Sequence, residues 1–244
     1  MSQDQKKTES MRPGKLADGR VIHCEDHVVV DFPGERPVLS SAVLNGGRCS
    51  AQSLLIMRVD ENFAGDADGF EHPQATLRAY ADDIGLNRAV VGMMTSASMN
   101  SCRVVEEEVD GIELGVVLTA GVSNARCIGD RAECRDVSVG VPAGGTINIV
   151  MATTARLTPS AMVECVMMVT EAKAHALHRL GIRSPVTDHM ATGTGTDSVA
   201  IVSGEAERTV TYCGKHTIFG ETLGRCVIEG LQDSLREARW GEVR

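Results

Sequence analysis

The sequence predicts an α/β protein: a single compact domain with a mixed β-sheet and long packing helices. Short, continuous apolar runs recur along the chain and are typical of strands buried on both faces. Two long segments combine helical apolar spacing with start and stop signals. The strand and helix candidates interleave without a strict β-α-β rhythm, which favours a mixed sheet over a purely parallel one.

Composition agrees with this class. The chain has 244 residues, enough for one large domain with a sizeable core. Hydrophobic residues make up 43% and charged residues 23%, which excludes a largely disordered or fibrous chain. Aromatic residues are only 3%, so we expect a core of aliphatic residues, alanine and the 11 methionines. The 25 glycines indicate many tight turns.

The first part of the chain and the cysteines bear on location. Residues 1–20 are polar and lack the apolar region of a secretion signal, so we expect a flexible tail followed by one domain over residues 21–244. No apolar run approaches the roughly 18 residues of a membrane-spanning helix. The eight cysteines are scattered without C-x-x-C spacing, which favours reduced thiols and a cytoplasmic protein.

The first half of the chain predicts strands, one loop and one helix. Strands are expected at residues 27–32, 38–44 and 54–59, and the turn Pro33-Gly34 is expected to end the first. The polar, glycine-containing segment 60–72 predicts a surface loop. A helix follows, with Pro73 at its first position and Gly85 as its stop.

The second half contains the clearest elements. Buried strands are predicted at residues 89–94, 112–118 and 146–152, and further strands at 199–202 and 209–212. A long helix is predicted after the N-cap Thr158, ending at Gly181. Its apolar stripe is expected to comprise Val163, Val166, Met167, Thr170, Ala174 and Leu177. A final helix is predicted from residue 218 to about 238.

Several function classes are disfavoured. The net charge of −9, without a basic segment, argues against nucleic acid as a partner. The chain lacks a P-loop, a G-x-G-x-x-G turn and a G-x-S-x-G elbow. His175 and His178 are spaced to share one face of a helix, but an ordinary solvated pair explains them, so no metal site is predicted.

Three polar segments could carry chemistry. The turn 194–197 offers hydroxyls, glycine backbone and the Asp197 carboxylate, although a tight turn before a strand explains it equally. Lys215 and His216 stand at a helix N-terminus, where the dipole disfavours cations, so either a function or a simple capping turn is open. Glu171 is expected at the edge of the apolar stripe, as a partly buried carboxylate or one half of a helix-flank salt bridge.

Seven segments in order resemble the adenosylcobinamide amidohydrolase family. They are residues 40–47, 94–99, 119–125, 145–149, 170–173, 191–197 and 214–217. Each segment alone is a weak signal, but seven in the correct order, spanning about residue 37 to 235, are specific.

The resemblance implies an enzyme of prokaryotic corrinoid salvage. Such enzymes hydrolyse the amide that links the aminopropanol arm of adenosylcobinamide to the corrin ring, giving adenosylcobyric acid and 1-amino-2-propanol. The alternatives are a non-catalytic corrinoid-binding carrier or sensor, and an amidase for a different amide. The corrinoid is then the substrate, and neither cofactor nor metal is expected. The expected partner is this small molecule, with no nucleic acid and no membrane, and a homo-oligomer is left open.

The matching segments also suggest roles. The expected catalytic residues are His216, Asp197, Glu171 and Lys215. In this hypothesis His216, oriented by a carboxylate, activates water or a hydroxyl such as that of Thr196, and Lys215 or Lys173 protonates the amine. The expected substrate-binding residues are Asn45, Ser98, Asn124, Asn148, Lys173, Thr194, Thr196 and Thr217, with the asparagines as oxyanion donors. A Cys213 nucleophile is the rival hypothesis.

Overall fold

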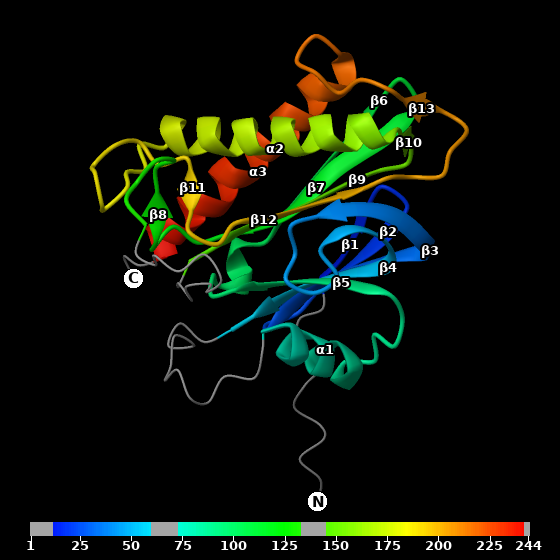
Figure 1. Cartoon of the computed structure of the whole chain (residues 1–244), viewed down its shortest axis with the longest axis horizontal. Helices are drawn as coiled ribbons and strands as arrows, with labels where there is room; N and C mark the ends of the chain where they lie inside the picture. The colour runs from blue at the N-terminus through cyan, green and yellow to red at the C-terminus, as the bar shows by residue number, and fades with distance from the viewer. Residues whose placement is uncertain (1–11, 60–72, 133–144, 242–244) are drawn as a thin grey trace, which may run out of the picture.

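The computed structural model describes residues 12–59, 73–132 and 145–241, which form four layers (Figure 1). Helices α2 and α3 cover one half of a large sheet, the other half lies beneath it, and α1 covers the far side. The elements are β1 (Arg12–Leu16), β2 (Gly19–His23), β3 (His27–Ser40), β4 (Gly47–Arg58), α1 (Pro73–Asp83), β5 (Val90–Thr95), the short 3-10 helix η2 (Met99–Ser101), β6 (Arg103–Val109), β7 (Ile112–Ala120), β8 (Ala125–Arg126), β9 (Ile147–Thr153), β10 (Arg156–Leu157), α2 (Pro159–Arg179), β11 (Gly193–Thr194), β12 (Ser198–Val202), β13 (Thr209–Val210) and α3 (Ile218–Gly241).

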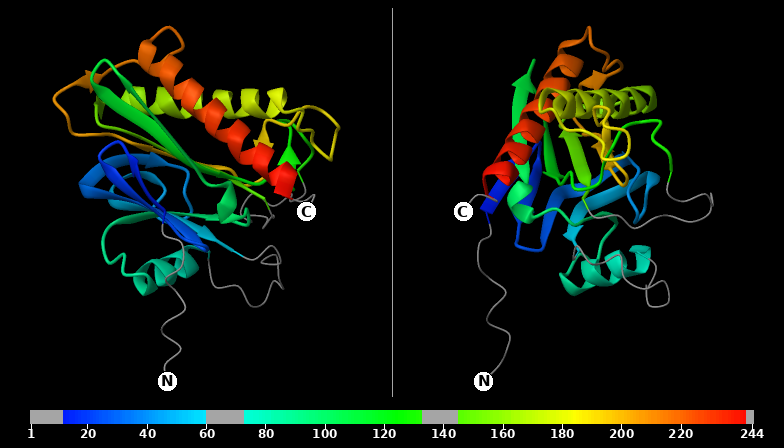
Figure 2. Two further views of the ribbon diagram at one scale, coloured as in Figure 1. Left: turned by 180° about the vertical axis from the view of Figure 1, so that it is seen from behind. Right: turned by 90° about the vertical axis from the view of Figure 1, so that its left-hand side faces the viewer.

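The nine-stranded sheet is mixed, as predicted. Its order is β1-β2-β3-β12-β9-β7-β6, with β4 joining β3 to β5. The β12–β9 and β4–β5 pairs are parallel, and the other pairs in this sheet are antiparallel. The long strand β3 links the two halves, because one part of it pairs with β2 and a later part pairs with β12. Figure 2 shows the two halves stacked face to face.

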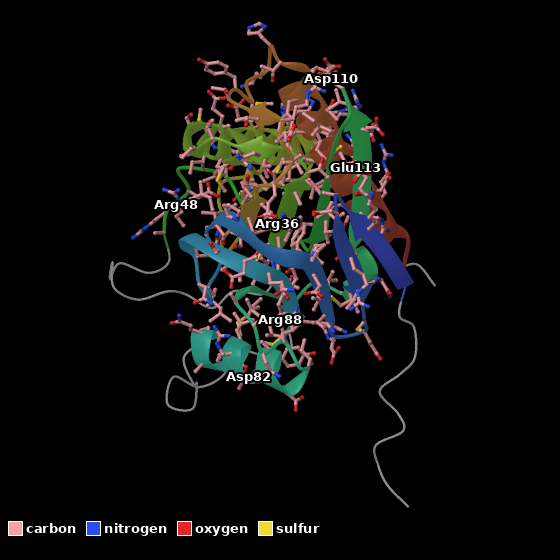
Figure 3. The ribbon with its side chains drawn as sticks, turned by 90° about the vertical axis from the view of Figure 1, so that its right-hand side faces the viewer. Arg36, Arg48, Asp82, Arg88, Asp110 and Glu113 are labelled. Atoms are coloured by element: carbon pink, nitrogen blue, oxygen red, sulfur yellow. The ribbon has the colours of Figure 1, made fainter. Side chains whose placement is uncertain are left out.

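Alternation along the strands separates two cores. In β9, Ile149 and Met151 pack under α2 and α3, whereas Val150 and Ala152 face the core between the two sheet halves. The same parity places Asn148 on the face between the halves. Arg36 is also buried and forms ion pairs with Asp18 and Glu205, which attach β3 to neighbouring loops (Figure 3).

Helix α2 confirms the predicted boundaries but not the predicted buried face. The Thr158 hydroxyl accepts a hydrogen bond from the Ala161 N–H, and Gly181 follows with a φ of +67°. Val163 and Met167, however, are 52% and 56% exposed. Of the predicted stripe, Leu177 is confirmed as buried. The other members of the buried face are Met162, Cys165, Met168, Val169, Ala172, Lys173 and Ala176, with Ala161 at its start. Because α2 carries apolar residues all round, spacing alone did not select the inward face.

Two further predictions are wrong. Residues 12–20, expected to belong to a flexible tail, are part of a β-hairpin, because Arg12–Leu16 pairs antiparallel with Gly19–His23. The rest of that expected tail lies outside the described residues. The Pro33-Gly34 turn does not end a strand: β3 continues through it with a shift in register between Asp31 and Arg36. The loop expected at 60–72 lies outside the described residues.

Most of the remaining predicted elements are present. The strand expected at 38–44 is the end of β3, which stops at Ser40, and the strand expected at 209–212 is the two-residue β13. The strands expected at 89–94, 112–118, 146–152 and 199–202 are present as β5, β7, β9 and β12. Helices α1 and α3 begin where predicted, and α1 is followed by Gly85 with a φ of +82°. The sequence analysis missed β6, an acidic strand beside β7. In the described part of the chain, no helix is long and apolar enough to cross a membrane.

Candidate active site

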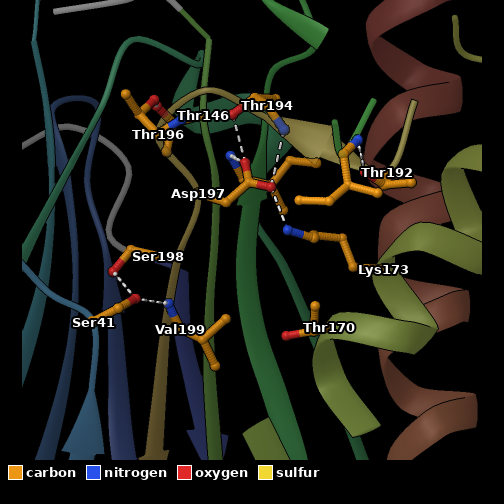
Figure 4. A network of polar contacts seen from close by, with 12 residues as sticks. Ser41, Thr146, Thr170, Lys173, Thr192, Thr194, Thr196, Asp197, Ser198 and Val199 are labelled. Carbon is orange, nitrogen blue, oxygen red and sulfur yellow. Dashed lines mark hydrogen bonds and ion pairs between the residues drawn. The ribbon is translucent and has the colours of Figure 1, made fainter. Parts of the chain in front are cut away.

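Asp197, in the turn before β12, is the centre of a buried polar network (Figure 4). One carboxylate oxygen, Oδ1, accepts hydrogen bonds from the Ile147 N–H at 3.0 Å and the Thr194 hydroxyl at 2.5 Å. The other, Oδ2, accepts from the Thr194 N–H at 3.0 Å and from the Lys173 ammonium. The side chain of Asp197 is only 10% exposed. Four donors therefore fix one carboxylate where β9, β11, β12 and α2 meet.

Lys173 reaches this carboxylate from α2. Its side chain is 9% exposed, and Asp197 is the one hydrogen-bond partner of its ammonium within the described ranges. Gly193 leaves room for the pair, since a Cβ there would lie 2.3 Å from Asp197 Oδ2 and 2.9 Å from Lys173 Nζ. The structure thus makes Lys173, predicted to bind substrate, the ion-pair partner of Asp197.

Two threonine hydroxyls meet on the opposite side of the same strand ends. Thr146 Oγ1 lies 2.7 Å from Thr196 Oγ1, and the Thr196 hydroxyl also lies 3.3 Å from the Gly145 carbonyl oxygen. The parallel register of Asn148 with Ser198 explains this, because Thr146 and Thr196 stand two residues earlier on the same face. Thr146 is buried and Thr196 is exposed, so the pair leads inward from the surface. On this side the Ser96 hydroxyl accepts a hydrogen bond from the Gly145 N–H.

Several polar atoms near this pair are buried and have no hydrogen-bond partner among the described residues. They are Thr119 Oγ1, Asn148 Oδ1 and both amide atoms of Asn124. Thr119 and Asn148 are neighbours across β7 and β9, and the Asn148 amide donates to the Met94 carbonyl at 2.8 Å. Because buried polar groups are normally paired, unpaired ones mark places where a ligand or water fits.

The structure does not bring the segment 214–217 to Asp197. Lys215 forms an ion pair with Glu171 on the outer face of α2, where their side chains are 65% and 51% exposed. The Thr217 hydroxyl donates to the Gly214 carbonyl at 2.8 Å and accepts from the Gly220 N–H at 3.0 Å, so it caps α3. His216 is exposed. Of the two interpretations of Glu171, the helix-flank salt bridge is confirmed and the partly buried carboxylate is wrong, because α2 turns Lys173 inward and Glu171 outward.

Two predicted binding residues also lie apart from the network. The Asn45 side chain donates to the Val90 carbonyl at 2.7 Å, at the start of β5. Ser96, which belongs to the network, follows the end of β5, and at the rise of a β-strand these two ends are about 20 Å apart. Asn45 lines an open depression of about 520 Å³ with Leu44, Gln74, Ala75 and Arg78. Ser98 is exposed and caps η2 by accepting from the Asn100 N–H. Ser96, two residues earlier, is the serine that reaches the site.

The rival nucleophile Cys213 is fully buried. Its sulfur lies 3.3 Å from the sulfur of Cys165, which is also 0% exposed, and its N–H donates to Glu164 Oε2 at 2.6 Å. The hydrogen bond to Cys213, followed by burial, raises the pKa of the Cys165 thiol. This pair therefore packs between α2 and the segment before α3 rather than facing the network. Among the described residues, no cluster of three or more His, Cys, Asp or Glu side chains could hold a metal ion.

Comparison with protein families identifies the family of the chain that carries this network. The family described as adenosylcobinamide amidohydrolase matches residues 13–242. The chain belongs to the adenosylcobinamide amidohydrolase family. Its match therefore covers β1 and β2 as well as the seven segments that first indicated it. The family is one of amide hydrolases that act on adenosylcobinamide.

Individual relatives agree with the family match. An adenosylcobinamide amidohydrolase of Methanosarcina mazei is 28% identical over 222 residues, which are 87% of this chain and 96% of that protein. An uncharacterised protein of Methanocaldococcus jannaschii is 34% identical over 170 residues, 62% of this chain and 65% of that protein. The chain thus spans slightly less than two thirds of the second relative and nearly all of the first.

Solved structures show weaker likeness. A Burkholderia beta-aminopeptidase is 11% identical, with a TM-score of 0.41 over 92% of this chain and 80% of that one. An L-aminopeptidase D-Ala-esterase/amidase from Ochrobactrum anthropi is 10% identical, with a TM-score of 0.39 over 93% and 79% of the two chains. Overlap at this level assigns no activity.

Sequence reasoning thus found Asp197, Thr194 and Thr196 as neighbours, but it gave no role to Thr146 or Ser96. Both belong to segments quoted for the resemblance, 145–149 and 94–99. The available signal was the pair of glycines before Thr146 at the start of a buried strand, since glycine there allows the backbone to approach another chain segment closely. Gly145 has a φ of +80°.

Proposed function

We propose that the protein hydrolyses the amide between the aminopropanol arm and the corrin ring of adenosylcobinamide, as an enzyme of corrinoid salvage. The products are adenosylcobyric acid and 1-amino-2-propanol. Membership of the family over residues 13–242 is the observation that carries this proposal. The buried network supports it, because three of the matching segments, 145–149, 170–173 and 191–197, converge on Asp197.

Amide hydrolysis needs an activated nucleophile and a proton for the leaving amine. Thr146 fits the first role: when its hydroxyl donates to Thr196 Oγ1, and Thr196 in turn donates to the Gly145 carbonyl, the lone pairs of Thr146 are left free. In this mechanism Thr146 Oγ1 bonds to the substrate carbonyl carbon and gives its proton to Thr196 Oγ1, while the hydroxyl proton of Thr196 turns from the Gly145 carbonyl and moves to the amine nitrogen. The C–N bond then breaks, 1-amino-2-propanol leaves, and water hydrolyses the resulting ester.

Asp197 and Lys173 act as positioning residues in this scheme. The carboxylate accepts from the Ile147 N–H, next to Thr146, and belongs to the residue next to Thr196. It therefore fixes the start of β9 against the start of β12, and this fixes the spacing of the two hydroxyls. Such positioning matters because misplacement by about 1 Å can cost a hundredfold in rate.

Incubation of the purified protein with adenosylcobinamide tests the proposed function. We expect many equivalents of 1-amino-2-propanol per protein, matched by adenosylcobyric acid, both measured by chromatography and mass spectrometry. Tight binding of the corrinoid without release would identify a carrier or sensor instead. Release only from an amide that is not a corrinoid would identify a different amidase.

The geometry also changes the expectation for His216. Both oxygens of Asp197 already accept hydrogen bonds, and Glu171 pairs with Lys215, so neither carboxylate orients His216 in this structure. We therefore expect His216→Ala to retain kcat within about threefold in the aminopropanol assay, whereas loss of a general base costs at least about a hundredfold. A hundredfold fall would restore His216 as the base.

A further inference from the structure

Asn124, in the loop between β7 and β8, has an unusual environment. Neither its Nδ2 nor its Oδ1 has a hydrogen-bond partner among the described residues, and both atoms are buried. An amide buried in this state destabilises the fold, because it has lost water and gained nothing in exchange. Folded proteins retain such groups mainly where a ligand completes the bonding.

The neighbours of this amide place it beside the backbone that leads into the two threonines. A Cβ on Gly145 would lie 2.8 Å from Asn124 Oδ1, and a Cβ on Gly195 would lie 3.7 Å from Asn124 Nδ2. These glycines directly precede Thr146 and Thr196. The amide thus lies between the backbone segments that carry the hydroxyl pair, and glycine at both positions keeps that space free of side chains.

The other two asparagines predicted as oxyanion donors are already engaged. The Asn148 amide nitrogen donates to the Met94 carbonyl at 2.8 Å, and the Asn45 amide nitrogen donates to the Val90 carbonyl at 2.7 Å. Asn148 lies in β9 and Asn45 in the turn between β3 and β4, and each bond joins that segment to the backbone around β5. Of the three, Asn124 alone has no hydrogen bond to a described residue at either amide atom.

We infer that the Asn124 side-chain amide binds the carbonyl oxygen of the scissile amide and stabilises the oxyanion. This inference rests on the proposed function. When the nucleophile bonds to the carbonyl carbon, the C=O π electrons move onto oxygen. The Nδ2–H of Asn124 donates a hydrogen bond to that negative charge without transferring a proton. Such a donor acts more strongly on the transition state than on the ground state, so it contributes to kcat more than to substrate affinity.

Asn124→Ala tests this assignment with three measurements. In the aminopropanol assay we expect kcat to fall by about 100- to 1000-fold, the range for loss of one oxyanion donor. We expect the dissociation constant for adenosylcobinamide, followed by corrin absorbance, to change by less than about fivefold. The Tm should stay the same or rise, because the substitution removes a buried amide that lacks a partner.

Two variants accompany it. Asn124→Asp keeps the shape but has no donor when ionised, so it should lose as much kcat as Asn124→Ala and covers the case in which the alanine variant fails to fold. Asn87→Ala, at an exposed asparagine after α1, is the matched control and should behave as wild type. A kcat within tenfold of wild type in the Asn124 variants overturns the inference, and so does a fall in kcat that accompanies a lowered Tm. Failure of the wild-type protein to cleave would instead refute the proposed function.

Discussion

Replacing Asp197 by asparagine is expected to destabilise the protein by about 3–5 kcal/mol and to lower kcat by at least about a hundredfold. The substitution leaves the Lys173 ammonium, whose side chain is 9% exposed, without a carboxylate in the interior. It also weakens the bond from the Ile147 N–H that holds the start of β9 against β12. Urea unfolding gives the first quantity, and the aminopropanol assay gives the second.

The reciprocal change, Lys173→Met, should cost less stability. The Asp197 carboxylate would still accept from the Ile147 N–H, the Thr194 N–H and the Thr194 hydroxyl, whereas Lys173 in the Asp197→Asn variant keeps no anionic partner in the described part of the chain. The double variant Lys173→Met/Asp197→Asn should therefore be more stable than Asp197→Asn alone, since it removes the uncompensated charge.

An exposed pair gives the matched control. Lys15 Nζ and Glu113 Oε1 are 2.6 Å apart, and the side chains are 55% and 38% exposed, so Lys15→Met should lower stability far less than Asp197→Asn. If Asp197→Asn costs no more than Lys15→Met, the buried pair does not hold the strand ends together. If Lys173→Met lowers the free energy of unfolding more than Asp197→Asn does, then the remaining donors do not stabilise the Asp197 carboxylate, contrary to this prediction.

The contrast between Lys173 and Glu171 shows what the sequence could and could not predict. The length, boundaries and cap of α2 follow from local chemistry, namely Thr158, Pro159 and Gly181. Its inward face does not follow, because valine and methionine occupy both sides of the helix and only packing against the sheet selects one. The predicted apolar stripe is offset by one residue from most of the observed buried face. Glu171 was therefore expected at the edge of the stripe, whereas the structure buries Lys173 and exposes Glu171.

The hydroxyl pair was beyond local reasoning for a different reason. Thr146 and Thr196 are 50 residues apart, and they meet because β9 and β12 are parallel neighbours in one particular register. The sequence predicted both strands and the polar turn at 194–197, but strand order and register depend on long-range packing. The segment that contains His216 differs from this, because its signal is local. Lys215 stands at a helix N-terminus, where the dipole disfavours a cation, and the structure compensates its charge with an ion pair to Glu171.

Thr146→Val is expected to have the largest effect on turnover, a loss of about a thousandfold or more in kcat, because it removes the proposed nucleophile with little change in shape. Thr196→Val should lower kcat by about 100-fold, since it removes only the path for the proton. Thr146→Ser keeps a hydroxyl and should retain measurable turnover. Each variant is measured in the aminopropanol assay, with Thr170→Val as control because that exposed hydroxyl has one hydrogen bond to the described residues, to the Val166 carbonyl of its own helix.

Mass spectrometry of acid-quenched reactions separates a nucleophilic threonine from a hydrolytic water that the same hydroxyls position. A covalent route predicts that wild-type protein gains the mass of the corrinoid acyl group and that peptide mapping places it on residue 146. Thr196→Val should still show this adduct, because the bond forms at Thr146, whereas Thr146→Val should show none. Turnover by Thr146→Val at the wild-type rate would mean that water attacks directly. The Thr146–Thr196 contact would then stabilise the strand ends, and the search for a base would move to the exposed side of Thr196.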